Sequence, residues 1–280
     1  MKIPDKDTIE SRIEKRMFHQ KPREYLGMSG IGHPCMKRQW YGFRWTKFLV
    51  IQARVNRIFR RGDLEEPRIV ADLEREGVKV FDDQEECVGF EKYVKGHIDG
   101  KALGLPESPK TVHLLEFKTM NDKAFNGYRS KKDNEPTGAS GVINLGVKAA
   151  KPIYYAQMQI YMHYLKLKRA LFIVSNKNDE HRYYERVRYD SVDAKELVLK
   201  AKNIVTSPMP PVSTLGPTSF ECRFCDFSDA CYMGHAPEIT CRSCERCDLI
   251  GGGKWACSRN NNVLSFDEQL DACQFYKRLF

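Results

Sequence analysis

The 280-residue sequence has no apolar run that approaches the roughly 18 to 20 residues of a membrane-spanning helix. Its N-terminus begins with charged residues and lacks the apolar segment of a secretory signal peptide. No segment repeats at a fixed spacing, which excludes a solenoid, and no motif resembles a flavin or nicotinamide site. We therefore expect a cytoplasmic, non-repetitive protein, and a redox enzyme is disfavoured.

Hydrophobic residues make up 41% of the chain, enough for at least one sizeable core and a small appended module. The net charge of +9 is concentrated at the N-terminus, because residues 1–61 hold 15 Lys and Arg against 5 Asp and Glu, and the rest of the chain holds 31 against 32. Between Lys37 and Arg61 the basic residues alternate with aromatic ones: Trp40, Tyr41, Phe43, Trp45, Phe48 and Phe59. This pattern suits a surface that binds phosphates and stacks on bases, and equally an amphipathic helix with a solvated basic side.

Periodicity and turn residues predict an α/β chain. The expected helices are 37–61 and, after a break at Gly62, 65–76, followed later by 152–167 and 192–205. The expected strands are 78–81, 93–98, 112–117, 170–175 and 183–189. We expect the first three strands to be neighbours in one sheet. The polar stretch 130–151 shows no periodicity and is predicted to be a loop.

The candidate catalytic residues lie at the ends of two predicted strands. Asp99 stands in Gly-His-Ile-Asp-Gly, and Glu116 follows 17 residues later in Leu-Glu-Phe-Lys. Strand alternation places Glu116 and Lys118 on one face and Phe117 on the other. Two carboxylates can hold Mg²⁺ through oxygen ligands, while a lysine orients or deprotonates the attacking water. Each residue alone also fits a turn or a solvated strand, so the prediction depends on their order and spacing.

Together with a helical Gln-x-x-x-Tyr, here Gln157 and Tyr161, these residues resemble the RecB-like nucleases of the PD-(D/E)xK superfamily. Gln157 and Tyr161 are one helical turn apart, so both can face the strand ends. Upstream, Gly62 followed by Glu66 resembles the Gly-x-x-x-Glu helix of the same family, with Glu65 as the competing candidate.

The resemblance covers about residues 33–233 and implies a restriction-endonuclease-like core, with a central mixed sheet flanked by helices. As in CRISPR-associated and lambda-type phage exonucleases, it implies degradation of DNA from an end, in recombination, repair or phage DNA processing. The implied catalytic residues are Asp99, Glu116, Lys118, Gln157, Tyr161 and Glu66. Mg²⁺ or Mn²⁺ would be held at Asp99, Glu116 and Phe117. The implied DNA-binding residues are Lys37, Arg38, Arg60, Arg61, Lys131 and Lys132.

Eight of the ten cysteines lie after residue 220, which in a reducing cytoplasm favours metal binding over disulfides. Cys222, Cys225 and Cys231 form Cys-x2-Cys-x5-Cys, and Cys35 stands alone upstream. This set resembles the iron–sulfur nucleases of the AddB type and of CRISPR systems, in which four such cysteines hold a 4Fe–4S cluster that joins the two ends of the domain. A four-cysteine zinc site would use the same ligands.

The last cysteines resemble a small zinc-binding module found at the ends of phage and bacterial proteins. Cys241 and Cys244 form a pair suited to tetrahedral Zn²⁺, and Cys257 and Cys273 are the other two expected ligands. Cys247 would be a spare or a substitute. A ferredoxin-like grouping of Cys241, Cys244 and Cys247 lacks the Cys-Pro that should follow, which argues against a second iron–sulfur cluster.

We thus expect three parts: a helical region with the nuclease core at 1–206, a linker and iron–sulfur segment that packs back on the core at 207–236, and a zinc module at 237–280. The module is expected to contact a recombination or replication protein, and a homo-oligomer is compatible with the sequence. The alternative function is a catalytically inert nucleic-acid-binding scaffold held by metal clusters. The intact set of Asp99 and its partners argues against that alternative.

Overall fold

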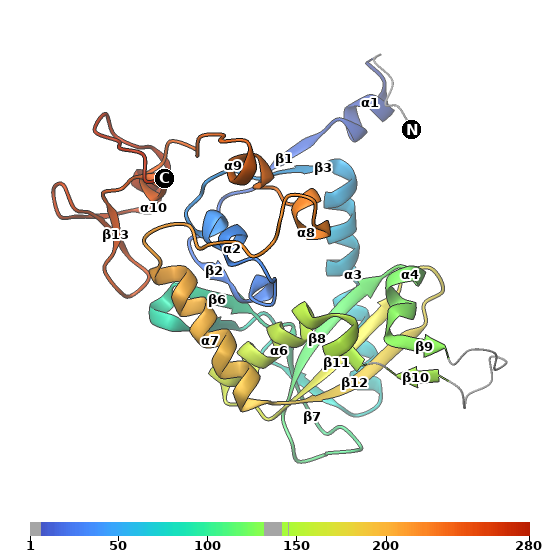
Figure 1. Ribbon diagram of the computed structural model, residues 1–280. Coiled ribbons are helices and arrows are strands. Elements are labelled where there is room, and N and C mark those ends of the chain that lie inside the picture. Colours follow the sequence, from blue (N-terminus) through green and yellow to red (C-terminus); the bar gives the residue numbers. More distant parts are fainter. Residues whose placement is uncertain (1–6, 132–141, 145) are drawn as a thin grey trace.

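The computed structural model describes residues 7–131, 142–144 and 146–280. Its largest sheet is five-stranded and mixed, with the strand order β12-β11-β8-β7-β4 (Figure 1). β11 runs parallel to β8, and the other neighbours are antiparallel. In the order given, the strands span Arg182–Arg188, Arg169–Asn176, His113–Met120, Gly100–Leu103 and Lys79–Phe81. The expected mixed α/β class is confirmed.

Helices cover both faces of this sheet because strand alternation gives it two apolar sides. On one side α3 (Ala53–Arg75) packs Ile69 into a core cluster that includes Leu115 and Phe117 of β8. On the other side α6 (Pro152–Leu165) shares the main core with Leu114. α7 (Ser191–Thr206) packs against α6 and against α2 (Met36–Phe43). Successive residues of β8 therefore face different helices.

Smaller units surround this core. A three-stranded sheet consists of β2 (Leu26–Gly27), β6 (Val94–His97) and β5 (Glu86–Val88). The other sheets pair β1 (Met17–His19) with β3 (Val50–Gln52), β9 (Arg129–Lys131) with β10 (Val142–Asn144), and β13 (Cys247–Leu249) with β14 (Trp255–Cys257) and β15 (Asn262–Leu264). The short helices are α1 (Ile9–Glu14), α4 (Asp122–Phe125), α5 (Gly146–Ala150), α8 (Phe220–Arg223), α9 (Ser228–Tyr232) and α10 (Phe266–Leu270). Among the described helices, none is both long and apolar enough to span a membrane.

The prediction that residues 93–98 join the strands at 78–81 and 112–117 in one sheet is wrong. β6 pairs with β2 and β5, and the neighbour of β8 is β7, a strand that we did not predict. Gly100, the first residue of β7, has a φ of +148°, a conformation that favours glycine. The chain changes sheets between β6 and β7, and Asp99 lies at that change.

The single helix predicted for residues 37–61 is also wrong. α2 ends at Phe43, Trp45 adopts a φ of +52°, and β3 precedes α3. Gly62, which was expected to break the helix, lies inside α3, and α3 continues through Pro67. Burial of one face of α3 against the sheet outweighs the helix propensity cost of about 1 kcal/mol for glycine and about 3 kcal/mol for proline.

The stretch 130–151 is not a loop throughout, because its described residues include parts of β9, β10 and α5. Lys132, one of the predicted DNA-binding residues, lies outside the described residues. The prediction failed because each of these elements is short and pairs with or packs on neighbours that periodicity cannot identify.

The interpretation of the early aromatic residues as a base-stacking surface is wrong for four of them. None of these four is more than 3% exposed: Trp40, Tyr41, Phe43 and Trp45. Trp40 and Tyr41 pack on the ring of Phe280, and Phe43 packs on Trp255. The C-terminal segment therefore lies beside α2 (Figure 1). The alternation of basic and aromatic residues reflects a helix whose aromatic side chains are buried against residues from the C-terminal end of the chain.

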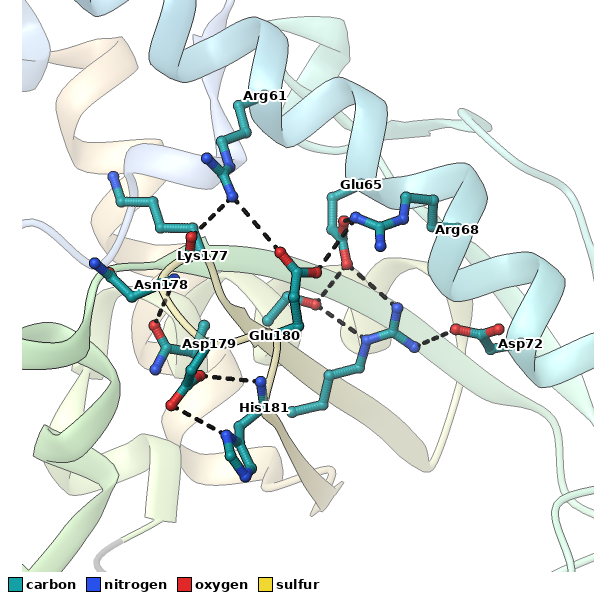
Figure 2. A network of polar contacts seen from close by, with 12 residues as sticks. Arg61, Glu65, Arg68, Asp72, Lys177, Asn178, Asp179, Glu180 and His181 are labelled. Carbon is teal, nitrogen blue, oxygen red and sulfur yellow. Dashed lines mark hydrogen bonds and ion pairs between the residues drawn. The ribbon is translucent and has the colours of Figure 1, made fainter.

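A charged network fixes α3 to the β11–β12 hairpin (Figure 2). Glu65, only 7% exposed, accepts hydrogen bonds from Ser175 Oγ at 2.8 Å and Arg182 Nη2 at 3.3 Å. Arg182 Nη1 also donates to Asp72 Oδ2 at 2.6 Å, about two turns after Glu65 along α3. At the exposed edge of the network, Glu180 forms ion pairs with two arginines of α3, Arg61 and Arg68. Glu65 is therefore the buried centre of the contact between α3 and the hairpin.

Replacement of Glu65 by alanine should lower the free energy of unfolding by about 3 kcal/mol, because it leaves the Arg182 guanidinium with only one of its two carboxylates. Urea denaturation measures this loss. Glu74→Ala, an exposed change on the same helix, is the control and should stay within about 0.5 kcal/mol of the wild type. Equal stability of the two variants would show that the network does not fix α3.

Candidate active site

Most of the predicted catalytic residues meet around β8. Glu116 Oε2 accepts a hydrogen bond from Gln157 Nε2 of α6 at 2.9 Å, and Glu116 Oε1 pairs with Lys118 Nζ. Asp99 Oδ2 accepts a hydrogen bond from the backbone N–H of Phe117 at 2.6 Å. The carbonyl of Phe117 in turn accepts a hydrogen bond from Lys118 Nζ at 2.9 Å. The structure thus brings the predicted Asp, Glu, Lys and Gln together from β8, α6 and the β6–β7 turn.

Tyr161 supports the segment that presents Asp99. Its hydroxyl donates to the carbonyl of His97 at 2.9 Å, and the side chain is 1% exposed. The ring lies so close to Gly96 that a Cβ at that position would collide with it. Tyr161 therefore fixes the end of β6, two residues before Asp99, and its own contact is structural.

The two adjacent glutamates of α3 have different surroundings. Glu65 is held by Ser175 and Arg182 in the network described above. Glu66 is half-buried and feels the charges of Asp99 and Lys118. The structure therefore favours Glu66 over Glu65 as the additional acidic residue of the site.

The site has more acidic side chains than its one lysine could balance if all of them were ionised. Burial raises the pKa of Glu116 to about 8, Lys118 opposes this rise, and Asp99 and Glu66 add to it. Burial and then the charge of Asp99 raise the pKa of Glu66 to about 7. Burial also raises the pKa of Asp99, against the effects of Lys118 and the Phe117 N–H. The pKa of Lys118 is raised, because the carboxylates of Glu116 and Asp99 outweigh the effect of its burial.

A cavity of about 410 Å³ opens beside this cluster, between α3 and α6. Its lining combines acidic side chains, Lys118 and Thr119 with three aromatic rings. The acidic residues are Asp63, Glu65 and Glu66, and the aromatic ones are Phe59, Phe117 and Tyr154. The Lys118 ammonium lies 5.3 Å from the centre of the Tyr154 ring. We did not predict Tyr154, although its position three residues before Gln157 on the same helix face was a usable signal.

In the part of the chain that the structure describes, no group of three or more His, Cys, Asp or Glu side chains is arranged so that it could hold a metal ion. At the candidate site both oxygens of Glu116 are engaged, by Lys118 and Gln157. The donor chemistry nevertheless fits Mg²⁺ or Mn²⁺, which prefer carboxylate oxygens. A divalent cation would also neutralise the excess negative charge of Asp99, Glu116 and Glu66.

The predicted DNA-binding residues have varied surroundings. Lys37 and Arg38 lie on α2 beside the first cysteine set, and Arg38 forms an ion pair with Asp226 at 3.6 Å. Arg60 and Arg61 are exposed on α3, but Arg61 donates to the carbonyl of Lys177 at 2.8 Å. Lys131 is the last residue of β9. Arg60 forms no ion pair with any described residue, and we expect it to be the most available of these side chains for a phosphate.

The first cysteine set converges in space although its members are far apart in the sequence. Cys35, at the N-cap of α2, lines one cavity with Cys222 of α8, Cys225 between α8 and α9, and Cys231 of α9. All ten cysteines of the chain are free thiols. Thiols are the donors that iron–sulfur clusters and zinc ions use, although among the described residues these four are not arranged as a group that could hold a metal ion.

The second cysteine set also shares one cavity. Its walls include the four predicted zinc ligands and the spare cysteine: Cys241, Cys244, Cys257, Cys273 and Cys247. Cys247 and Cys257 face each other across the β13–β14 ladder. Cysteine sulfurs are the donors that tetrahedral zinc sites use, and this set has one more than the four required; in the described part of the chain they are not arranged to hold a metal ion.

No protein-family model matches this chain, and no curated protein matches it. Among solved structures, a protein described as SSO0001 is 14% identical over 78% of this chain and 90% of its own, with a TM-score of 0.40. The alkaline exonuclease LHK-Exo of Laribacter hongkongensis is 16% identical over 65% of this chain and 87% of its own, with a TM-score of 0.45. LHK-Exo in complex with dAMP covers 65% and 86% at 16% identity, with a TM-score of 0.43. At these TM-scores we draw nothing from the likenesses about the function of this chain.

The excess negative charge predicts a pH-dependent stability. The folded-state pKa of Glu66, about 7, exceeds its ordinary value of 4.5, so the folded protein binds more protons between these values and its free energy of unfolding falls as the pH rises through them. Because Glu66 is half-exposed, we expect a loss on the order of 1 to 2 kcal/mol relative to Glu66→Gln, which cannot ionise. Urea denaturation of both proteins with EDTA, from mildly acid to neutral pH, measures the difference.

Millimolar Mg²⁺ should reduce this loss in the wild type, since a bound divalent cation stabilises the ionised carboxylates. Parallel pH curves for the wild type and Glu66→Gln would contradict the charge excess. If Mg²⁺ leaves the dependence of the wild type's free energy of unfolding on pH unchanged, the proposed metal site is contradicted.

Proposed function

We propose that this protein is a divalent-metal-dependent nuclease that hydrolyses phosphodiester bonds in DNA. The observation that carries this proposal is the meeting of Asp99, Glu116, Lys118 and Gln157 beside a cavity that Glu66 also lines. These residues come from α3, the β6–β7 turn, β8 and α6. A buried excess of carboxylates destabilises a fold, so it is better explained by chemistry than by stability.

The chain's own residues have distinct roles in this proposal. Glu116 and Asp99 would hold Mg²⁺ or Mn²⁺, which lowers the pKa of a bound water and neutralises the phosphate. Gln157 orients Glu116 through the hydrogen bond to Oε2. Lys118 reaches both the Glu116 carboxylate and the cavity, so its ammonium can contact the attacking water or a phosphate oxygen. Phe117 offers only its backbone carbonyl to a metal ion, and Lys118 contacts that carbonyl.

In the ion-paired arrangement Lys118 supplies the positive charge that Glu116 requires. Glu116 and Asp99 would hold a divalent cation whose charge balances their carboxylates, and the Lys118 ammonium would then be available to the substrate. The role of Lys118 is therefore coupled to metal binding through the carboxylate that both share.

We further propose that the enzyme acts from DNA ends, in recombination, repair or phage DNA processing. The support is the resemblance of the ordered motif set to RecB-like nucleases, together with the exposed Arg60 on the helix that borders the cavity. Arginines near the site would contribute phosphate contacts whose strength falls as the salt concentration rises.

The two cysteine sets are proposed to bind different metals. The set of Cys35 would hold a 4Fe–4S cluster, and the set of Cys241 would hold Zn²⁺. The support is that each set of thiols lines one cavity, and that the first set joins α2 to segments near the opposite end of the chain. The proposed role of both centres is structural.

Lys118→Ala should reduce DNA degradation at least about a hundredfold, because a charge that stabilises the transition state is lost from a water-poor site. Anaerobically purified protein is assayed with Mg²⁺ on end-labelled single-stranded and double-stranded DNA. Lys123→Ala, on the exposed surface of α4, is the control and should degrade DNA like the wild type. Equal degradation by Lys118→Ala would indicate a contaminant, and no degradation of any substrate by the wild type would favour the inert scaffold.

Metal analysis tests the cofactors separately. We expect about four iron atoms, about four sulfides and about one zinc ion per chain. Cys222→Ser should remove the iron and keep the zinc, whereas Cys273→Ser should remove the zinc and keep the iron. A colourless wild type with two zinc ions would contradict the iron–sulfur cluster and leave the nuclease proposal intact.

A further inference from the structure

Two arginine side chains are buried next to the C-terminal cysteines. Arg242 is fully buried and Arg44 is 5% exposed. Arg44 is the C-cap of α2, and Arg242 lies between Cys241 and Cys244, 198 residues later in the sequence. A guanidinium does not lose its proton in proteins, so two positive charges occupy one interior region.

All the hydrogen-bond partners of these two side chains are neutral. Arg44 Nη1 donates to the carbonyls of Cys247 at 3.0 Å and Arg242 at 3.4 Å. Arg242 Nη1 donates to the carbonyl of Phe43 at 3.1 Å, and its Nε donates to Gln269 Oε1 at 2.7 Å. Arg44 Nε and Arg242 Nη2 are buried without a partner. Neither guanidinium forms an ion pair with a carboxylate in the described part of the chain.

Aromatic rings enclose the two charges. The Arg242 guanidinium lies 4.0 Å from the ring centre of Trp45 and 4.5 Å from that of Trp255. Arg44 lies 4.9 Å from the same Trp255 ring. Cation–π contacts attract a guanidinium but supply no negative charge. The carboxylates of Asp248 and Glu24 act on Arg44 and Arg242 without forming an ion pair with them among the described residues, so two buried charges with this little compensation disfavour the folded state.

The adjacent cysteines can supply the missing charge. As neutral thiols they would leave both arginines uncompensated. Four thiolates around one divalent cation carry a net charge of −2, which balances the two guanidiniums. Cys247, the first residue of β13, lines the cysteine cavity, and its carbonyl accepts the hydrogen bond from Arg44, so this guanidinium lies at the edge of the cysteine set.

We propose that Arg44 and Arg242 are the charge partners of a tetrathiolate metal centre formed by the C-terminal cysteines, and that loading of this centre holds the C-terminal segment against α2. The inference rests on the Zn²⁺ proposed above for this set. The hydrogen bonds of the two arginines themselves join the C-terminal segment to α2. Arg242 donates to the carbonyl of Phe43 in α2, and Arg44 donates to the carbonyl of Cys247 in β13.

The C-terminal segment is also joined to the core at a second point. The Tyr93 hydroxyl donates to the carbonyl of Lys254 at 2.5 Å and accepts hydrogen bonds from the N–H groups of Ile250 and Gly251. These bonds hold the β13–β14 turn in place. The other end of the β13–β14 hairpin, where Cys247 and Cys257 lie, is held by the hydrogen bonds of the arginines.

Zinc affinity tests the charge pairing directly. Arg44→Met and Arg242→Met remove a charge and keep much of the volume, so each should weaken zinc binding at least about tenfold in competition with a chelating dye. Arg242→Lys keeps the charge and should recover most of the affinity. Arg259→Met is the matched control, because Arg259 lines the same cavity but is exposed, and its affinity should stay near that of the wild type. Unchanged affinity in both buried variants overturns the proposal.

Removal of zinc provides a second measurement. Chelation should lower the Tm of the wild type more than that of Arg44→Met/Arg242→Met, because only the wild type is left with two uncompensated charges. Equal losses of Tm overturn the charge pairing. In the wild type, chelation should also make the C-terminal segment sensitive to trypsin, and persistent protection overturns the metal-dependent docking even if a variant fails to fold.

The outcomes separate this inference from the proposed function. A wild type that binds no zinc at this set overturns the metal assignment together with the inference. The Lys118→Ala assay of DNA degradation is independent of both, since Lys118 lies at the other metal site.

Discussion

The buried ion pair between Glu116 and Lys118 is the constraint on which the rest of the site depends. A carboxylate on the inner face of β8 requires a cation and hydrogen-bond donors, because water cannot reach it. Lys118, two residues along the same face, and Gln157 of α6 supply these groups. The contact orients α6, and Tyr161 on the same helix in turn fixes the end of β6 before Asp99. One buried charge thus determines how α6, β6 and β8 meet.

α2 links the two cysteine sets. Its N-cap is Cys35, a member of the first set, and its C-cap is Arg44, which contacts β13 of the second set. Between them Trp40 and Phe43 pack on residues from the C-terminal end of the chain. A helix held by its two ends and by its buried face explains why the aromatic residues near the N-terminus are core residues and are not available to bases.

Adjacent residues of one helix can serve different purposes. Both glutamates line the cavity of the candidate site, but Glu65 is engaged in the contact between α3 and the β11–β12 hairpin, whereas Glu66 is subject to the charges of Asp99 and Lys118. Both are acidic and both are near Gly62, so the motif alone left the choice between them open. Their surroundings favour Glu66: Glu65 is held by Ser175 and Arg182, and the pKa of Glu66 responds to the charges of Asp99 and Lys118.

The sequence by itself predicted Asp99, Glu116, Lys118 and Gln157, the alternation of β8, helices α6 and α7 and the two groups of cysteines, because spacing within one element or motif is a local property. Only the tertiary structure decided that β6 and β7 belong to different sheets, that α3 runs through Gly62, and that Arg44 and Arg242 share one buried region. Strand partners and the burial of a charge depend on residues that are distant in the chain, so local pattern does not specify them.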